Sequence, residues 1–383
     1  MSFFTTFKNE LKYIFKDPAI LLTIIGGVIL YSFLYPQPYA NQSVSGLSVS
    51  IIDYDKSDIS RDIIFKLKAT PQIEITRHDL SEKDAKEALI HDKIKAIIII
   101  PKHFKKDLAL NKSPTIAVGA DSSYFLIYGA VLEAAMKSVL TQAATIKVAN
   151  LLKKEVPLSQ AKISYTPYSL HIINLFNKNN SYTQYVVPAV FVLILQQIIL
   201  IGLGILGGGI NEKLKRKEKG YFLTAPIWHM FLSRIGIFFS LFFIHMLFYF
   251  GYSFELFHVS RLGNIYDLLH FGVAYLLATI AFGIFIGSLL NSREIATPIV
   301  LFSSLPLVFS AGFVWPIGSL PPFIHYLSLL VPSTLGIDGF LKLNQMGANF
   351  DMIIHSYAIL WIQATLYLGL AYGIFHLRRT HTN

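Results

Sequence analysis

Few residues in this chain have the types and spacing that catalysis or the binding of a nucleotide or metal requires. Gly202, Gly204 and Gly207 match the glycine spacing of a dinucleotide-binding turn, which needs a preceding strand and a surrounding βαβ unit. Here the glycines lie inside a long apolar segment. We therefore interpret Gly204 and Gly208 as positions where two membrane helices approach each other closely.

Other sequence patterns that carry chemistry are missing. There is no Walker A sequence, and the 12 histidines show neither His-Glu-x-x-His nor another metal-ligand spacing. There is also no Gly-x-Ser-x-Gly nucleophile elbow, and the lack of cysteine excludes disulfides, thiolate metal sites and cysteine nucleophiles. We predict a chain with no catalytic residue, no metal and no bound cofactor, so that any ATP it uses is bound by another polypeptide.

A few polar residues fall within or beside apolar segments. His245 could contact a proton or a substrate, although a hydrogen bond between helices is the simpler interpretation. Gln196 and Gln197 could line a path or bridge helices in the same way. Glu255 and Asp338 stand at segment edges, and we expect both at the outer interface, because a charge at the bilayer centre costs roughly 2.5–3.5 kcal/mol.

The composition indicates a membrane protein. Hydrophobic residues make up 53% of the 383 residues and charged residues 15%, whereas soluble chains carry about 25% charged residues. Uncharged runs of roughly 20 residues recur, and each is long enough to cross a bilayer. The net charge of +10 does not indicate nucleic acid, because the basic residues flank apolar segments instead of forming one aromatic-rich patch.

The first 35 residues combine a basic start with an apolar stretch. Lys8, Lys12 and Lys16 precede an uncharged run over 18–35, which is typical of either a signal peptide or a retained anchor. We favour the anchor, because the run fills most of a bilayer and residues 36–41 contain no clear cleavage site. Residues 1–35 are thus predicted to be a cytoplasmic N-terminus and a first transmembrane helix.

Residues 36–178 have the pattern of a soluble mixed α/β domain. Short apolar runs alternate there with charged, helix-compatible segments, which indicates a partly parallel sheet. The expected strands are Leu47–Ile52, Ile73–Thr76, Ala96–Ile100 and Thr115–Gly119, and the expected helices are Ser57–Ala69, Ser81–Asp92 and one long helix over 128–146. Ser57 and Ser81 are expected to cap their helices.

Residues 179–383 are predicted to form a five-helix transmembrane domain. The apolar segments are 182–210, 235–254, 268–290, 295–315 and 353–375, so that six crossings in all place both termini on one side. Lysine and arginine beside these segments assign the termini to the cytoplasm and the α/β domain to the outside. Prolines break the uncharged stretch 316–337, which we expect to be a re-entrant outer hairpin.

The connection over 211–234 admits two interpretations. Its basic run leads through Gly220 and Pro226 into a short amphipathic segment before the next membrane helix. The positive charge could serve only to set the topology. Alternatively, the connection is a cytoplasmic coupling loop that docks on a motor.

Several motifs together resemble a permease subunit of the second ABC export type, over essentially the whole chain. The motifs are residues 49–57 and 101–108 in the soluble domain, Glu218-Lys219-Gly220 with Thr224-Ala225-Pro226 in the cytoplasmic connection, and 312–316, 320–322, 331–332 and 342–347 in the outer hairpin. The fold implied is an α-helical polytopic membrane protein with six transmembrane helices and an inserted mixed α/β extracytoplasmic domain.

The resemblance implies export of a hydrophobic or drug-like compound across the inner membrane. It implies a second copy or a paralogous permease, two cytoplasmic subunits that bind ATP and Mg²⁺, lipid contacts and, in some members, a periplasmic adaptor. The site residues expected from it are Glu218, Lys219, Gly220, Thr224, Pro226 and Arg234 for coupling, Gln196, Gln197, Gly312 and Pro316 for the path, and Glu255 and Asp338 at the outer edge. The alternatives are an ion-coupled secondary transporter, which would need ionisable residues near the membrane centre, and a structural scaffold of an envelope or secretion assembly.

Overall fold

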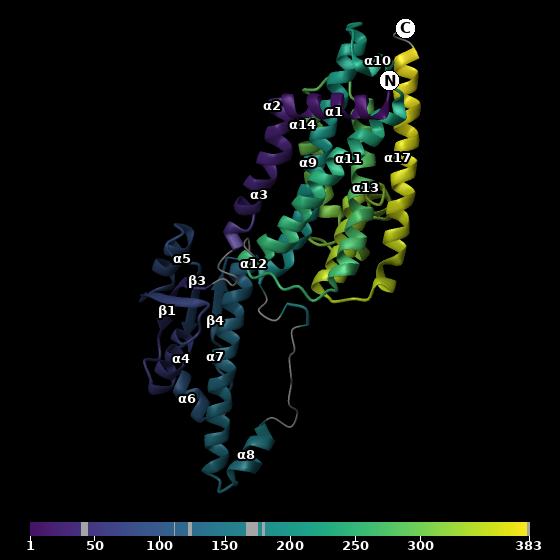
Figure 1. Ribbon diagram of the computed structural model, residues 1–383. Helices are drawn as coiled ribbons and strands as arrows, with labels where there is room; N and C mark the ends of the chain where they lie inside the picture. Colours follow the sequence, from purple (N-terminus) through teal and green to yellow (C-terminus); the bar gives the residue numbers. More distant parts are fainter. Residues whose placement is uncertain (40–44, 111, 122–124, 166–174, 178–180, 381–383) are drawn as a thin grey trace. The chain divides into compact units, whose positions relative to one another are not determined.

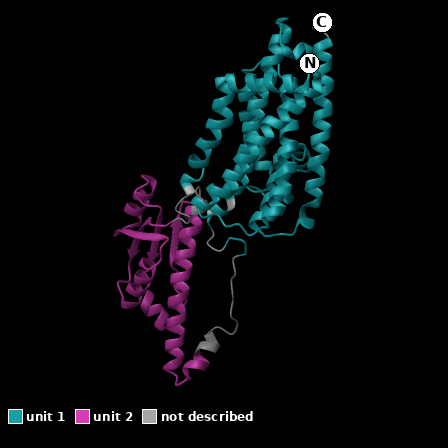
Figure 2. Ribbon diagram, in the orientation of Figure 1, with its two compact units in different colours: residues 1–42, 174–383 teal, residues 43–173 magenta. Residues whose placement is uncertain are grey.

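The computed structural model describes residues 1–39, 45–110, 112–121, 125–165, 175–177 and 181–380. The chain divides into two compact units (Figure 2). One unit combines residues 1–42 with 174–383, and the other comprises residues 43–173. The first is helical, and the second contains the sheet (Figure 1).

The helical unit is organised around α9. Its helices are α1 (Phe3–Lys16), α2 (Pro18–Leu21), α3 (Val28–Leu34), α9 (Tyr182–Lys215), α10 (Tyr221–Thr224), α11 (Ile227–Leu247), α12 (Phe254–Leu256), α13 (Ile265–Leu289), α14 (Ala296–Ser310), α15 (Pro322–Ser328), α16 (Pro332–Phe340) and α17 (Ile354–Thr380). α9 packs against α13, α14 and α16, and its apolar length is almost entirely buried. A helix that is apolar on every side is stable only when neighbours surround it, which explains the central place of α9.

Four helical stretches among the described residues are long and apolar enough to span a membrane. They are Val186–Lys215, Ile227–Leu256, Ile265–Leu289 and Phe350–Thr380. Two further helix pairs pass the same test jointly but are bent, Phe3–Lys16 with Pro18–Leu34 by 77° and Pro322–Ser328 with Pro332–Gln345 by 89°. The structure therefore supports a multi-pass protein with four to six spans.

The predicted fifth crossing is shorter than expected. The sequence suggested a segment from Ile295 to about Trp315, whereas α14 ends at Ser310 after 15 residues. Such a helix is about 22 Å long, less than the ~30 Å of a hydrocarbon core. The chain turns at Gly312, whose φ of +87° is a conformation that only glycine adopts without strain. As predicted, the proline-rich stretch that follows is broken into short helices, α15 and α16.

Glycines on α9 allow it to contact its neighbours at backbone distance. A Cβ on Gly204 would lie 2.9 Å from the Cβ of Ala296, and one on Gly208 would lie 2.5 Å from the carbonyl oxygen of Ser292. The close approach of two helices predicted at Gly204 is confirmed, because Ala296 is the first residue of α14, whereas Gly208 packs against the connection between α13 and α14. α9 and α13 also approach each other at backbone distance, since a Cβ on Gly207 would lie 2.6 Å from backbone atoms of Gly287.

The smaller unit is a mixed α/β domain. Its described strands are β1 (Leu47–Asp53), β2 (Ile73–His78), β3 (Ala96–Ile100) and β4 (Ala117–Ala120), and its helices are α4 (Asp58–Lys68), α5 (Glu82–Ile90), α6 (Phe104–Ala109), α7 (Phe125–Leu152) and α8 (Leu158–Tyr165). The strand order is β2-β1-β3-β4, with β1 parallel to both neighbours and β4 antiparallel to β3. The partly parallel sheet, its strands and the long helix are thus confirmed.

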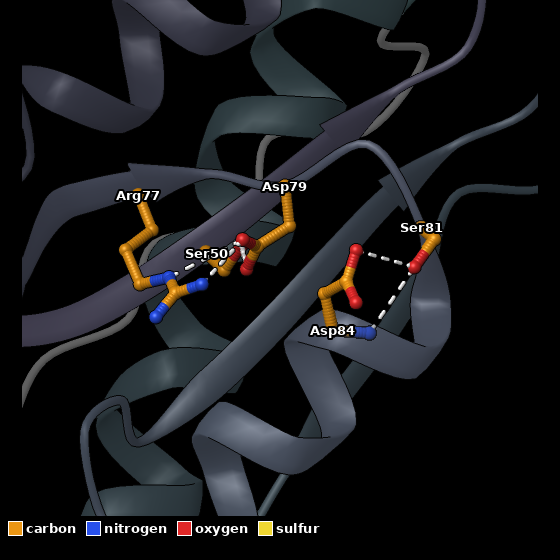
Figure 3. Close-up of polar contacts among 5 residues, drawn as sticks. All are labelled: Ser50, Arg77, Asp79, Ser81 and Asp84. Atoms are coloured by element: carbon orange, nitrogen blue, oxygen red, sulfur yellow. Dashed lines mark hydrogen bonds and ion pairs between the residues drawn. The ribbon is translucent and has the colours of Figure 1, made fainter.

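A polar cluster stands on the sheet beside the start of α5 (Figure 3). The hydroxyl of Ser50, which is fully buried on β1, donates to Asp79 Oδ2 at 2.7 Å, and Arg77 Nη2 donates to Asp79 Oδ1 at 2.7 Å. These hydrogen bonds, that of Arg77 above all, hold the pKa of Asp79 below its ordinary value. Ser81 caps α5 by accepting from the Asp84 N–H at 3.1 Å, as its position in the sequence predicted.

Candidate coupling site

The N-terminal helix α1 and the helix α2 that follows it each begin at a side-chain cap. Ser2 Oγ accepts the Thr5 N–H at 3.3 Å, and Asp17 Oδ1 accepts the Ala19 N–H at 3.0 Å at the start of the next helix. Pro18 occupies the first position of that helix, where its missing N–H costs nothing. The break at Asp17 separates α1 from the predicted first membrane segment.

One face of α1 buries an acidic residue among apolar neighbours. Thr6, Glu10 and Ile14 are buried at four-residue spacing, and Glu10 pairs with Arg234 of α11. Arg234 Nε lies 3.2 Å from both carboxylate oxygens of Glu10, and Nη2 lies 3.0 Å from Oε1. The side chains are 4% and 0% exposed for Arg234 and Glu10. This bidentate ion pair fixes α1 to α11.

Tyr221, the first residue of α10, adjoins the same ion pair. Burial raises the pKa of its phenol, and the Glu10 carboxylate raises that pKa further. The phenol therefore stays neutral at physiological pH. α10 is in this way positioned beside both members of the pair.

A second ion pair joins the bend after α1 to the connection between α13 and α14. Arg293 Nη2 lies 2.9 Å from Asp17 Oδ1 and 2.8 Å from Oδ2. Burial, the largest single influence, raises the pKa of Asp17, but the hydrogen bonds from Arg293 and from the backbone of Ile20 and Ala19 together bring it below its ordinary value. The pair is thus ionised at neutral pH and holds the bend in place.

The connection after α9 leaves the helix through a tight turn. Lys217 has a φ of +55°, its N–H donates to the Leu214 carbonyl at 3.0 Å, and the Glu218 N–H donates to the Lys213 carbonyl at 2.9 Å. These two hydrogen bonds are those of a Schellman helix end, here with lysine at the position that glycine usually occupies. After this turn the chain continues through Glu218 and Gly220 to α10.

The C-terminal helix α17 holds the other side of the connection. Arg379 Nη1 donates to the Ala225 carbonyl at 2.7 Å, and its Nη2 donates to the Leu223 carbonyl. Thr224, between these two carbonyls, keeps its side chain exposed. In addition, Trp228 stacks on Tyr372 with ring centroids 5.1 Å apart. The short helix α10 is therefore anchored by α17 as well as by α1.

An open cleft of about 740 Å³ lies beside α1 and α10. α1, the end of α9, α10 and the connection after α13 all contribute to its wall. Lys213 Nζ lies 4.6 Å from the centroid of the Tyr13 ring, which is a cation–π contact between α9 and α1. The charged lining side chains are Lys12, Lys16, Asp17, Glu212, Lys213, Arg216, Glu218, Arg293 and Glu294.

The structure brings most of the predicted coupling residues together. Glu218 and Lys219 are exposed on the connection, Gly220 caps α10, and Thr224 and Pro226 flank its end. A Cβ on Gly220 would lie 2.2 Å from the Phe222 ring, so no larger residue fits there unless that ring moves.

Arg234 stands apart from these coupling residues. The sequence placed it in the loop over 211–234, but this range also includes the last residues of α9 and the first eight of α11, and Arg234 belongs to α11. The amphipathic segment expected before the third membrane segment is part of α11 itself, because Ile227, Met230 and Phe231 continue its buried face. Arg234 lies buried against Glu10, so its side chain is not on an exposed surface.

The polar residues predicted along a path bridge helices in the structure. Gln196 Nε2 donates to Ser333 Oγ at 2.9 Å, and its Oε1 accepts the Ser333 N–H at 2.7 Å. Gln197 Nε2 donates to Ser304 Oγ at 2.7 Å. α9 is thereby bonded to α16 and α14. The other two predicted path residues, Gly312 and Pro316, lie in the connection between α14 and α15.

The remaining candidate residues also form hydrogen bonds or ion pairs within the protein. His245 Nε2 lies 3.0 Å from the Ile24 carbonyl oxygen, which is the interhelical hydrogen bond that the sequence favoured. Glu255 accepts from Arg261 at 2.7 Å on the surface. Asp338 pairs with Lys342 at 2.8 Å and accepts the hydroxyl of Ser356 at 3.0 Å.

Sequence reasoning missed four anchoring residues. The signal for Glu10 was present, since it is an acid on the apolar face of a basic helix, four residues from Thr6 and from Ile14. Asp17 before a proline was a readable helix cap. No local pattern identified Arg293 or Arg379, whose partners are 276 and 154 or more residues away in the chain.

Several helices among the described residues are long and apolar enough to cross a bilayer, as in a multi-pass membrane protein. Residues 18–372 match the model of a family described as ABC-2 family transporter protein, so the chain belongs to this family. The resemblance read from the motifs is confirmed. ABC-2 members are the membrane subunits of transporters and work with separate ATP-binding subunits.

A curated relative is the linearmycin resistance permease protein LnrN of Bacillus subtilis (strain 168). It is 27% identical over 143 residues, which is 37% of this chain and 37% of the relative. The matched region is thus well under half of either protein.

Proposed function

We propose that this chain is the permease subunit of an ATP-driven exporter that moves a hydrophobic or drug-like compound out of the cytoplasm or the inner membrane. Family membership supports an ABC permease, and the relative with a role in resistance supports export. The observation that carries the coupling mechanism is the anchoring of α10. This helix of four residues is held by Arg379 of α17 and stands beside the Glu10–Arg234 pair that joins α1 to α11.

In the proposed mechanism the ATP-binding subunit engages the exposed connection from Glu218 to Pro226. Movement of the motor displaces α10, and the Arg379 hydrogen bonds transfer the displacement to α17. The Glu10–Arg234 pair makes α1 and α11 move together. A complete switch between two states requires roughly 5.5 kcal/mol of differential interaction, which nucleotide binding and hydrolysis can supply.

The proposed assembly has two permease chains, either two copies or this chain with a paralogue, on two ATP-binding subunits that hold ATP and Mg²⁺. The chain is placed in the inner (cytoplasmic) membrane with both termini in the cytoplasm and residues 36–178 outside, in contact with lipid and, where present, with a periplasmic adaptor. Substrate passes along the interface between the permeases, beside the second and fifth membrane segments. Glu255 and Asp338 then belong to the outer edge.

Cysteine crosslinking tests the docking surface, because the chain contains no native cysteine. Thr224→Cys, which is exposed on the connection, should form a crosslink to a co-purifying ATP-binding subunit with a short bifunctional reagent. Glu255→Cys, also exposed but predicted on the other side of the membrane, is the matched control. Equal crosslinking of both variants, or purification without any ATPase partner, would contradict the proposal.

Loss of coupling is the second readout. Replacing Glu218 and Gly220 together by alanine should abolish transport and the stimulation of ATPase activity by reconstituted permease, while membrane insertion is retained. Full activity of that double variant would show that the connection does not carry the coupling.

A further inference from the structure

The smaller unit contains an apolar pocket that neither the family nor the coupling site accounts for. Its volume is about 540 Å³, within the roughly 300–1,000 Å³ typical of small-molecule sites. Three parts of the unit line it: Ile63 of α4, residues within α6 and within 112–118, and one face of α7.

The pocket exists because α7 is longer than the sheet on which it packs. With 28 residues α7 extends about 42 Å, whereas the seven residues of β1 extend about 23 Å. Figure 1 shows α7 continuing well past the strands toward α8. Val131, Ala134 and Ala135 are buried against the sheet, but the apolar face continues through Val139 and Ile146. The face of α7 from Leu132 to Ile146 forms one wall of the pocket.

The pocket has apolar walls and one basic lining residue, Lys112. Met136 and Leu140 remain 53% and 56% exposed, which is unfavourable for large apolar side chains in water. Gln142 lines the pocket and accepts a hydrogen bond from Lys66. Lys112 lines it too, and its Nζ lies 3.7 Å from Asp107 Oδ1, a long ion pair that leaves ammonium N–H groups for a ligand.

We propose that this pocket binds a single-chain amphiphile with an anionic head, whose hydrocarbon chain lies along α7 and whose head group is paired with Lys112. Apolar walls favour the chain, and the ammonium group of Lys112 complements a carboxylate. A neutral lipid would leave this charge unused. The inference concerns the smaller unit alone and does not depend on the coupling mechanism.

The test uses the full-length chain in lipid nanodiscs with a hexadecanoic acid that carries a photoactivatable diazirine. After irradiation, mass spectrometry of the peptides should locate label within residues 132–146. Ala143→Trp places an indole at the pocket wall, at an exposed position, and should remove this label. Ala149→Trp is the matched control, because Ala149 is an exposed residue of α7 that does not line the pocket.

A separate experiment tests whether the head group is paired with Lys112. Lys112→Gln, which removes the charge without adding an acidic group, should reduce labelling by the acid probe by up to about five-fold, the value of one exposed ion pair, and leave labelling by the corresponding hexadecanol probe unchanged. Two results would overturn the proposal. One is label that is confined to the membrane helices in every variant. The other is an efficient disulfide between two copies of the Met136→Cys variant, which would make this face an interface between copies.

Discussion

The buried pair between Glu10 and Arg234 gives the sharpest prediction for this protein. Replacing Arg234 by methionine leaves the Glu10 carboxylate at 0% exposure without its partner. Removing one member of a buried ion pair costs roughly 3–5 kcal/mol, because the remaining charge is neither solvated nor paired. Glu10→Gln should cost a similar amount. The double variant, with both charges removed, should recover most of the loss, since no charge is then left buried.

The assay is the apparent melting temperature of the detergent-purified protein for both single variants and the double variant. Glu255→Gln is the matched control, because the Glu255–Arg261 pair is 77% and 42% exposed and should contribute less than about 1 kcal/mol. The reasoning would be refuted by single variants that lose no more than this control. A double variant that loses the sum of the two single losses would refute it equally.

Three further results are expected. Gly220→Ala places a methyl 2.2 Å from the Phe222 ring and should reduce permease-stimulated ATPase activity at normal expression, whereas Gly373→Ala, with no atom within 4 Å of the added methyl, should be neutral. Arg379→Ala removes the hydrogen bonds to the Leu223 and Ala225 carbonyls and should lower transport more than it lowers the melting temperature. An unchanged transport rate would show that these hydrogen bonds do not transfer movement from α10 to α17. Because the pKa of Asp79 is lowered in the folded state, its contribution to stability is complete above about pH 4 and is lost as the pH falls through the folded-state pKa. Hydrogen exchange of the smaller unit between pH 6 and pH 3 should show this loss in the native chain and not in Asp79→Asn.

Local patterns predicted the elements well. Ser57 and Ser81 located two helix starts, and alternating strands and helices predicted a partly parallel sheet. Gly204 and Gly208 indicated the tight packing of α9. These features depend on capping, on hydrophobic period and on side-chain size, which are properties of residues close together in the chain.

The first and last residues of the membrane helices were predicted less accurately. The third membrane segment was expected to begin at 235, but α11 begins at Ile227, because the connection before it supplies part of the buried face of this helix. The segment 295–315 contains enough apolar residues to cross a bilayer, yet its helix ends at Ser310. Hydropathy measures the preference for an apolar environment and does not reveal where the backbone turns, as it does at Gly312.

The sequence by itself determined that this is a membrane protein of the ABC-2 type with an α/β unit and an exposed basic connection. Only the tertiary structure determined what holds that connection. Glu10 and Arg234 are 224 residues apart, and Arg379 binds carbonyls 154 and 156 residues before it. An isolated glutamate or arginine has many possible partners, and the choice among them depends on which helices pack together. The packing of α1, α11 and α17 around α10 makes that choice.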